Sequence, residues 1–86
     1  MDFSAERIDL STIQFTPELL RCVPAATARK HRALPVADSP GCLSIALADI
    51  DLYVIDALAF TLNRELAIRI ADGQQLDMFL RRLYAD

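Results

Sequence analysis

The chain has 86 residues, a formal net charge of −3 at pH 7 and 53% hydrophobic residues. This length corresponds to one domain rather than two, and the apolar content excludes an intrinsically disordered chain. The acidic balance argues against a general nucleic-acid binder, because such proteins normally carry an excess of basic residues on one face.

Residues 1–14 are polar with scattered apolar positions, and we expect them to form an extended or frayed N-terminal arm. Acidic residues follow Met1 closely, at Asp2 and Glu6, so the sequence does not predict a secretory signal. No apolar run approaches the roughly 18 residues that a membrane span needs. We expect residues 15–86 to form a single domain.

The first helical signal follows this arm. Thr16, Pro17 and Glu18 form a helix start, because threonine caps helices, proline fits the first helical position and glutamate suits the positive end of the dipole. Pro24 interrupts the helical pattern. The sequence therefore predicts two short helices that meet at a bend, the second running from Pro24 to about His31.

Three short runs predict β-strands. Residues 33–37 contain Pro35, which cannot donate to a ladder and therefore indicates an edge strand. A turn and the alternating residues 42–48 follow, which together predict a hairpin. The alternating residues 66–71 come after an intervening helix. Strands on either side of a helix should be parallel, with a right-handed connection.

Two longer helices complete the pattern. The first begins at Asp51 and ends at Asn63, a residue suited to a left-handed stop. Its apolar positions at helical spacing are Leu52, Ile55, Leu58, Ala59 and Leu62. The last helix begins at Asp72, and Gln75 three residues later resembles a capping box. Its buried stripe is expected to consist of Leu76, Phe79, Leu80 and Leu83.

The sequence therefore predicts a small α/β (α+β) fold. Its elements should follow the order α-α-β-β-α-β-α, and its three strands should form one mixed sheet with the helices packed on it.

No set of residues in the sequence resembles a catalytic, cofactor or metal site. A phosphate-binding loop needs several glycines, whereas Gly41 and Gly73 each stand alone in a turn. His31 is the only histidine, and its cationic neighbours do not suit a general base. Asp49 and Asp51 could hold Mg²⁺, but capping and turn formation explain them without a metal. We expect no enzymatic activity, no cofactor and no bound metal.

The two cysteines, Cys22 and Cys42, are too few for a disulfide scaffold. We expect them to be reduced and mostly buried thiols, which is typical of a cytosolic protein.

Basic residues are concentrated near the second short helix, at Arg21, Arg29, Lys30 and Arg32. This cluster could contact phosphates, acidic lipid or an acidic partner, or it could be a solvated helix end, where cations are favoured. If the domain has an interface, these four residues are the first candidates for partner binding. Arg81-Arg82 near the chain end has the same two interpretations.

A series of short motifs runs from about Asp9 to Tyr84. In chain order they are Asp9-Leu10-Ser11, Pro17-Glu18-Leu19-Leu20, Val23-Pro24, Ala28-Arg29-Lys30-His31-Arg32-Ala33-Leu34-Pro35-Val36, Leu43-Ser44-Ile45-Ala46-Leu47-Ala48-Asp49-Ile50-Asp51, Asp56-Ala57-Leu58 and Leu83-Tyr84. Their order and spacing resemble the N-terminal domain of type II secretion and type IV pilus assembly ATPases, the general secretion pathway protein E family. The chain departs from that family where Ala48-Asp49-Ile50 replaces the frequent Ala-Asp-Pro. Some relatives bind cyclic di-GMP through motifs that begin Arg-Leu-Gly, and none occurs here, so ligand binding is not carried over.

The resemblance implies a non-catalytic, cytoplasmic docking and regulatory domain of such an ATPase. The implied partners are the cytoplasmic domain of an inner-membrane platform protein and the downstream ATPase domain of the same protein, so membrane association would be indirect and no nucleic acid would be bound. Three alternatives stay open. They are a cyclic dinucleotide (c-di-GMP) receptor, suggested by the basic residues at 29–32, an accessory domain fused to another enzyme such as a glycosyltransferase, and a nucleic-acid or membrane-surface binder.

Overall fold

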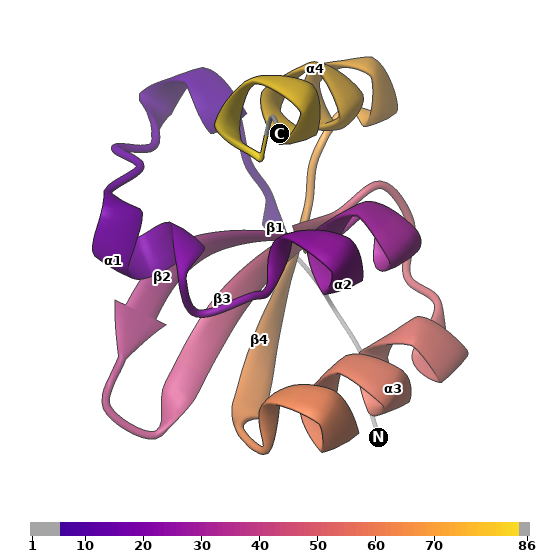
Figure 1. Cartoon of the computed structure of the whole chain (residues 1–86). Helices are drawn as coiled ribbons and strands as arrows, with labels where there is room; N and C mark the ends of the chain where they lie inside the picture. Colours follow the sequence, from indigo (N-terminus) through magenta and orange to yellow (C-terminus); the bar gives the residue numbers. More distant parts are fainter. Residues whose placement is uncertain (1–5, 85–86) are drawn as a thin grey trace.

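The structure, a computed structural model, describes residues 6–84 (Figure 1). The elements in chain order are β1 (Glu6–Arg7), the 3₁₀ helix η1 (Leu10–Thr12), α1 (Pro17–Leu20), α2 (Ala25–His31), β2 (Leu34–Ser39), β3 (Cys42–Leu47), α3 (Leu52–Leu62), β4 (Glu65–Ile70) and α4 (Gly73–Leu83). The predicted α/β class is confirmed, and so are the two short N-terminal helices, the hairpin and the two longer helices.

The strands form one mixed sheet in the order β1-β4-β3-β2. Strands β2 and β3 are antiparallel, whereas β3 and β4 are parallel, as the intervening helix predicted. The predicted number of strands was wrong, because the described sheet has four strands rather than three. The additional strand is β1, which pairs in parallel with Arg69 and Ile70 of β4. Two exposed charged residues give no alternating pattern, so the sequence held no strand signal there.

Part of the expected N-terminal arm contributes to the fold, while residues 1–5 lie outside the described residues. Leu10 in η1 is fully buried, and its backbone N–H donates to Oε1 of Gln75 in α4 at 3.1 Å. The same Gln75 side chain donates from Nε2 to Oδ1 of Asp9 at 3.0 Å. This segment is therefore held between β4, through β1, and the first turn of α4.

The predicted helix caps are present. The Thr16 side chain accepts from the N–H of Leu19 in α1, and Asp51 accepts from the first turn of α3. Asp72 accepts from the N–H of Gln75 in α4. The capping box there is incomplete, because the Gln75 side chain reaches the N-terminal segment instead of returning to Asp72. Asn63 ends α3 in the left-handed conformation, at φ 53°.

The β2–β3 hairpin turns at Pro40 and Gly41. Gly41 has φ 78°, the left-handed backbone that the third position of a type II turn requires. As predicted, Pro35 lies in an edge strand, since β2 is at one end of the sheet order. The register of β2 against β3 shifts between Pro35 and Ala37, which marks a bulge in this edge.

One hydrophobic core joins the sheet and the helices. Its largest fully buried side chains are Leu10, Leu34, Leu43, Ile45, Leu58, Leu76, Val23 and Pro35. In α4, Leu76 and Leu80 are buried as expected, whereas Phe79 is half-buried and packs against Phe15 with ring centroids 5.7 Å apart. Figure 1 shows α4 and α3 at opposite ends of the molecule, with α2 between them.

Candidate functional site

The candidate site begins at the end of α2, where basic side chains accumulate. Arg29, Lys30 and His31 form the last turn, and cations are favourable there because they complement the negative end of the helix dipole. Arg32 follows in the left-handed conformation, at φ 51°, and its N–H donates to the carbonyl of Ala28. This C-cap ends the helix and directs the chain into β2.

Two arginines of this segment reach across to α4. Arg32 donates from Nε to Oδ1 of Asp77 at 2.8 Å and from Nη2 to the carbonyl of Gly73 at 3.3 Å. Arg29 donates from Nη1 to the carbonyl of Tyr84 at 3.1 Å. The earlier residue of α2 contacts the end of α4 and the later one contacts its start. The two segments therefore run in opposite directions beside each other.

Both arginines line a surface pocket of about 400 Å³. It is lined by Arg29, Arg32, Asp77, Leu80 and Arg81. A second pocket shares Asp77 and Arg81 with it and adds Gln74, Met78 and Arg82. We call the residues that line these two pockets the α4 basic face. It combines four arginines with a single carboxylate, which is itself paired with an arginine.

The structure brings together only some of the residues that the sequence suggested for partner binding. Arg29 and Arg32 line the first pocket, whereas Arg21 at the end of α1 and the exposed Lys30 line neither. Arg81 and Arg82, for which the sequence left open a contact with an anion or a solvated helix end, line the pockets as well. Nothing in the sequence indicated that Arg32 and Asp77, which lie 45 positions apart, would meet.

The chemistry available at the α4 basic face is recognition of anions. Guanidinium groups donate several hydrogen bonds in a fixed plane and suit carboxylates or phosphates. The face contains no histidine, cysteine or serine that could act as a base or nucleophile. It can therefore bind an acidic surface, and its one carboxylate, Asp77, is paired with Arg32.

Tyr84 is hydrogen-bonded to Arg29, one of the residues of this face. It is buried, its hydroxyl donates to the carbonyl of Leu20 at 2.9 Å, and its own carbonyl accepts from Arg29. Burial disfavours the phenolate and raises the pKa of Tyr84 to about 12. The residue thus connects the end of α4 to both short N-terminal helices.

We expect Tyr84→Phe to lower the free energy of unfolding by about 1 kcal/mol at neutral pH, because the Leu20 carbonyl loses its donor. The pKa of Tyr84 is higher in the folded chain, so this side chain contributes stability that is fully present below pH 10 and is lost as pH rises through about 12. Urea denaturation of both proteins should show a smaller difference above pH 10. A constant difference across that range would contradict the assignment.

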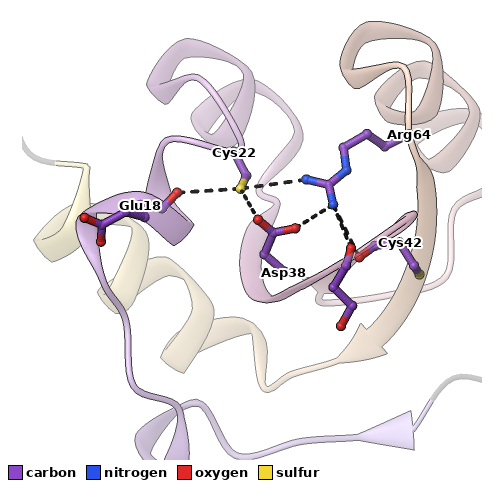
Figure 2. Close-up of polar contacts among 6 residues, drawn as sticks. Glu18, Cys22, Asp38, Cys42 and Arg64 are labelled. Atoms are coloured by element: carbon purple, nitrogen blue, oxygen red, sulfur yellow. Dashed lines mark hydrogen bonds and ion pairs between the residues drawn. The ribbon is translucent and has the colours of Figure 1, made fainter.

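A second polar cluster surrounds Arg64, in the loop between α3 and β4 (Figure 2). Its Nη2 contacts Oδ1 of Asp38 at 2.5 Å and the carbonyl of Ser39 at 3.0 Å. Cys22 contacts both charged groups: its thiol donates to Oδ2 of Asp38 at 3.5 Å, and Nη1 of Arg64 donates to its sulfur at 3.9 Å, as Figure 2 shows. The cluster therefore joins the end of α1, the β2–β3 hairpin and the start of β4.

This cluster is structural rather than reactive. Desolvation, and then the hydrogen bond to Asp38, raise the pKa of the Cys22 thiol, so the nucleophilic thiolate is disfavoured. Cys22 and Cys42 are free thiols, but both are half-buried, less buried than the sequence suggested. The described residues include no group of three or more His, Cys, Asp or Glu side chains placed to hold a metal.

We expect Arg64→Met to destabilise the domain at neutral pH, because the aliphatic stem stays while the ion pair and the hydrogen bonds to the hairpin are lost. The hydrogen bond from Arg64 lowers the pKa of Asp38 below its usual 3.8. The stability from this pair is therefore present above pH 3.8 and is lost as pH falls through the folded pKa. Thermal unfolding at neutral and acidic pH should show the two proteins converging in acid. A gap that persists there would contradict the ion-pair explanation.

None of the described helices has the length and apolar content that a bilayer span requires.

Comparisons with known proteins identify the family. A sequence model of the MshEN domain matches residues 3–86. The chain is similar to the solved structure of MshE with cdg, with 31% identity and a TM-score of 0.81 over 91% of this chain and 58% of that chain. It is also similar to two crystal forms of the N-terminal domain of XpsE, with 19% and 20% identity, TM-scores of 0.73 and 0.75, and coverage of 91% of this chain and 56% of those.

At that identity the XpsE likeness shows the fold alone, and no curated protein matches the sequence with significance. The chain spans less than two thirds of the length of the solved chains it matches. The family match nevertheless covers nearly all of this sequence, and it confirms the resemblance found in the motifs. The chain belongs to the MshEN domain family, the type of N-terminal domain found in type II secretion and type IV pilus assembly ATPases.

Proposed function

We propose that this domain is a non-catalytic docking and regulatory module of a type II secretion or type IV pilus assembly ATPase. In this proposal it works in the cytoplasm and reaches the inner membrane indirectly, by binding the cytoplasmic domain of a platform protein. The downstream ATPase domain of the same protein would be its second partner. The observation that carries the proposal is the α4 basic face, where four arginines from two segments line two adjoining pockets that contain a single carboxylate.

The face suits an acidic protein surface for two reasons. Arg29 and Arg32 are held in place by hydrogen bonds to α4, so less side-chain freedom is lost when a partner binds. Arg81 and Arg82 are exposed beside them and can meet carboxylates with charge-assisted hydrogen bonds. Because the chain as a whole is acidic, this local excess of positive charge favours one orientation of the encounter.

Calorimetric titration of the domain with the purified cytoplasmic domain of the platform protein tests this proposal. We expect saturable binding that weakens as salt is added, because exposed charges are screened over about 10 Å at 0.1 M ionic strength. The same titration with the intact ATPase is the control for a site that needs the rest of the protein. Absence of binding in both titrations would contradict the proposal.

A c-di-GMP receptor is the second candidate, and the similarity to MshE with cdg favours it. Two facts weigh against it in this chain. The sequence contains no Arg-Leu-Gly motif, and it spans only 58% of the MshE chain in that structure. Calorimetry with c-di-GMP separates the candidates. Heat of binding with the domain alone would support the receptor, whereas heat that appears only with a longer protein would place the ligand elsewhere.

The reading frame that encodes the domain offers a separate test of the parent protein. A Walker phosphate-binding loop encoded downstream of residue 86 would support the ATPase assignment. A glycosyltransferase domain in that position would instead favour the alternative of an accessory domain fused to another enzyme.

A further inference from the structure

The outward side of α3 carries large apolar side chains. Phe60 is 89% exposed, Tyr53 79%, Leu52 59% and the preceding Ile50 43%. The inner side of the same helix is also apolar and is buried in the core through Ile55 and Leu58. A helix that is apolar on all sides is normally covered on all sides. One side of α3 is therefore left without the covering that its composition calls for.

These side chains form a single patch. Tyr53, Ala57 and Phe60 are spaced four and three residues apart, so they follow one another along one stripe of the helix. Ala57, which lies between the two aromatic residues on the stripe, has a small side chain. Apart from Met78 on α4, the exposed large hydrophobic residues among the described part of the chain all belong to residues 50–60. Such concentration marks an interaction surface, whereas single apolar residues scattered over a surface do not.

The charged residues of the segment that carries this patch are all acidic. Residues 33–63 contain no lysine or arginine, and the exposed carboxylates of Asp49, Asp51 and Asp56 lie in the same segment. Asp56 is three residues from Tyr53 and four from Phe60, so it borders the stripe directly. Two copies of α3 packed against each other would bring these carboxylates together, which argues against a symmetric dimer through this face. Anionic lipid is disfavoured for the same reason.

We infer that this α3 outer face, formed by Ile50, Leu52, Tyr53, Asp56, Ala57 and Phe60, is a docking surface for a basic amphipathic helix of another protein. The apolar stripe of that helix would cover Tyr53 and Phe60, and lysines or arginines beside its stripe would meet the carboxylates around the patch. A helix is the suitable partner because its stripe of side chains matches α3 in width and can lie along it. Figure 1 places α3 far from α4, so this surface is separate from the α4 basic face and has the opposite charge.

Two synthetic helical peptides test the inference. They share the same leucine stripe, and one is flanked by lysines while the other is flanked by glutamates. Fluorescence anisotropy with the domain should show binding of the lysine peptide and binding at least about tenfold weaker for the glutamate peptide. Added salt should weaken the binding of the lysine peptide to the domain.

Variants assign the binding to α3. Phe60→Ser should lower the affinity for the lysine peptide by about tenfold or more, because exposed aromatic anchors dominate such interfaces. Thr61→Ala, an exposed neighbour on the same helix, should leave the affinity unchanged. Circular dichroism should show that both variants stay folded, since neither side chain is in the core.

Several outcomes would overturn the inference. They are no binding of the lysine peptide, equal binding of both peptides, or a Phe60→Ser variant that binds as well as the original chain. Self-association that is lost in Phe60→Ser would assign the face to a second copy instead. Binding to anionic lipid vesicles that is lost in this variant would assign it to a membrane surface.

Discussion

Leu10→Ala is expected to lower the free energy of unfolding by about 2–5 kcal/mol, the usual cost of removing a buried leucine side chain. Leu10 has no exposed surface, and it lies in the short η1 segment between β1 and α4. Its substitution leaves a cavity against the core and loosens the segment whose backbone donates to Gln75. For a domain of this size such a loss is a large share of the total stability. Urea denaturation monitored by circular dichroism measures it.

Leu52→Ala is the matched control, because it makes the same change at a position that is 59% exposed. We expect its effect to stay within about 0.5 kcal/mol. Equal effects of the two substitutions would mean that the N-terminal segment is not part of the cooperative core. The experiment therefore also addresses the predicted division of the chain into an arm at 1–14 and a domain at 15–86.

Arg81→Glu/Arg82→Glu is expected to weaken binding to the acidic platform partner by about tenfold to a hundredfold, because like charges opposed across an interface are strongly unfavourable. Both side chains are exposed and line the second pocket, and Arg81 also lines the first. The double variant reverses the charge of the α4 basic face without touching Arg29 or Arg32. Calorimetric titration with the platform domain measures the change, and circular dichroism checks that α4 is intact.

Arg21→Glu/Lys30→Glu changes the net charge by the same amount at exposed positions that line neither pocket. We expect the affinity for the platform domain to fall by less than about threefold, because only long-range electrostatics would change. The comparison distinguishes a local face from a general effect of charge. It also separates the four residues that the sequence suggested, because Arg29 and Arg32 lie at the face while Arg21 and Lys30 do not. A larger loss of affinity in this control would assign the interface to α1 and the exposed side of α2 instead.

Local signals in the sequence predicted most of the fold. Thr16, Asp51 and Asp72 each cap a helix within three residues of their own position, so composition and spacing were sufficient to place those helix starts. Strand β1 could not be predicted in this way. It is two residues long, both side chains are exposed, and its pairing with β4 joins residues more than sixty positions apart.

The candidate surfaces were less predictable because they depend on tertiary packing. The ion pair between Arg32 and Asp77 requires α2 and α4 to lie beside each other, which no periodicity in either helix indicates. Leu52 shares its helical spacing with Ile55, yet Leu52 is largely exposed while Ile55 is buried. In a helix that is apolar on every side, spacing alone does not identify the side that meets the core.

Both outer strands of the described sheet are poor templates for a foreign strand. At one margin, β1 offers only two residues, Glu6 and Arg7, and both are charged. At the other, β2 has Pro35, which lacks an amide hydrogen, followed by the bulge that breaks the regular ladder. Charge, proline and irregularity at sheet margins are the means by which natural proteins avoid edge-to-edge aggregation. Pairing of this sheet with a strand of another chain is therefore disfavoured, even though α3 displays Tyr53 and Phe60 to solvent.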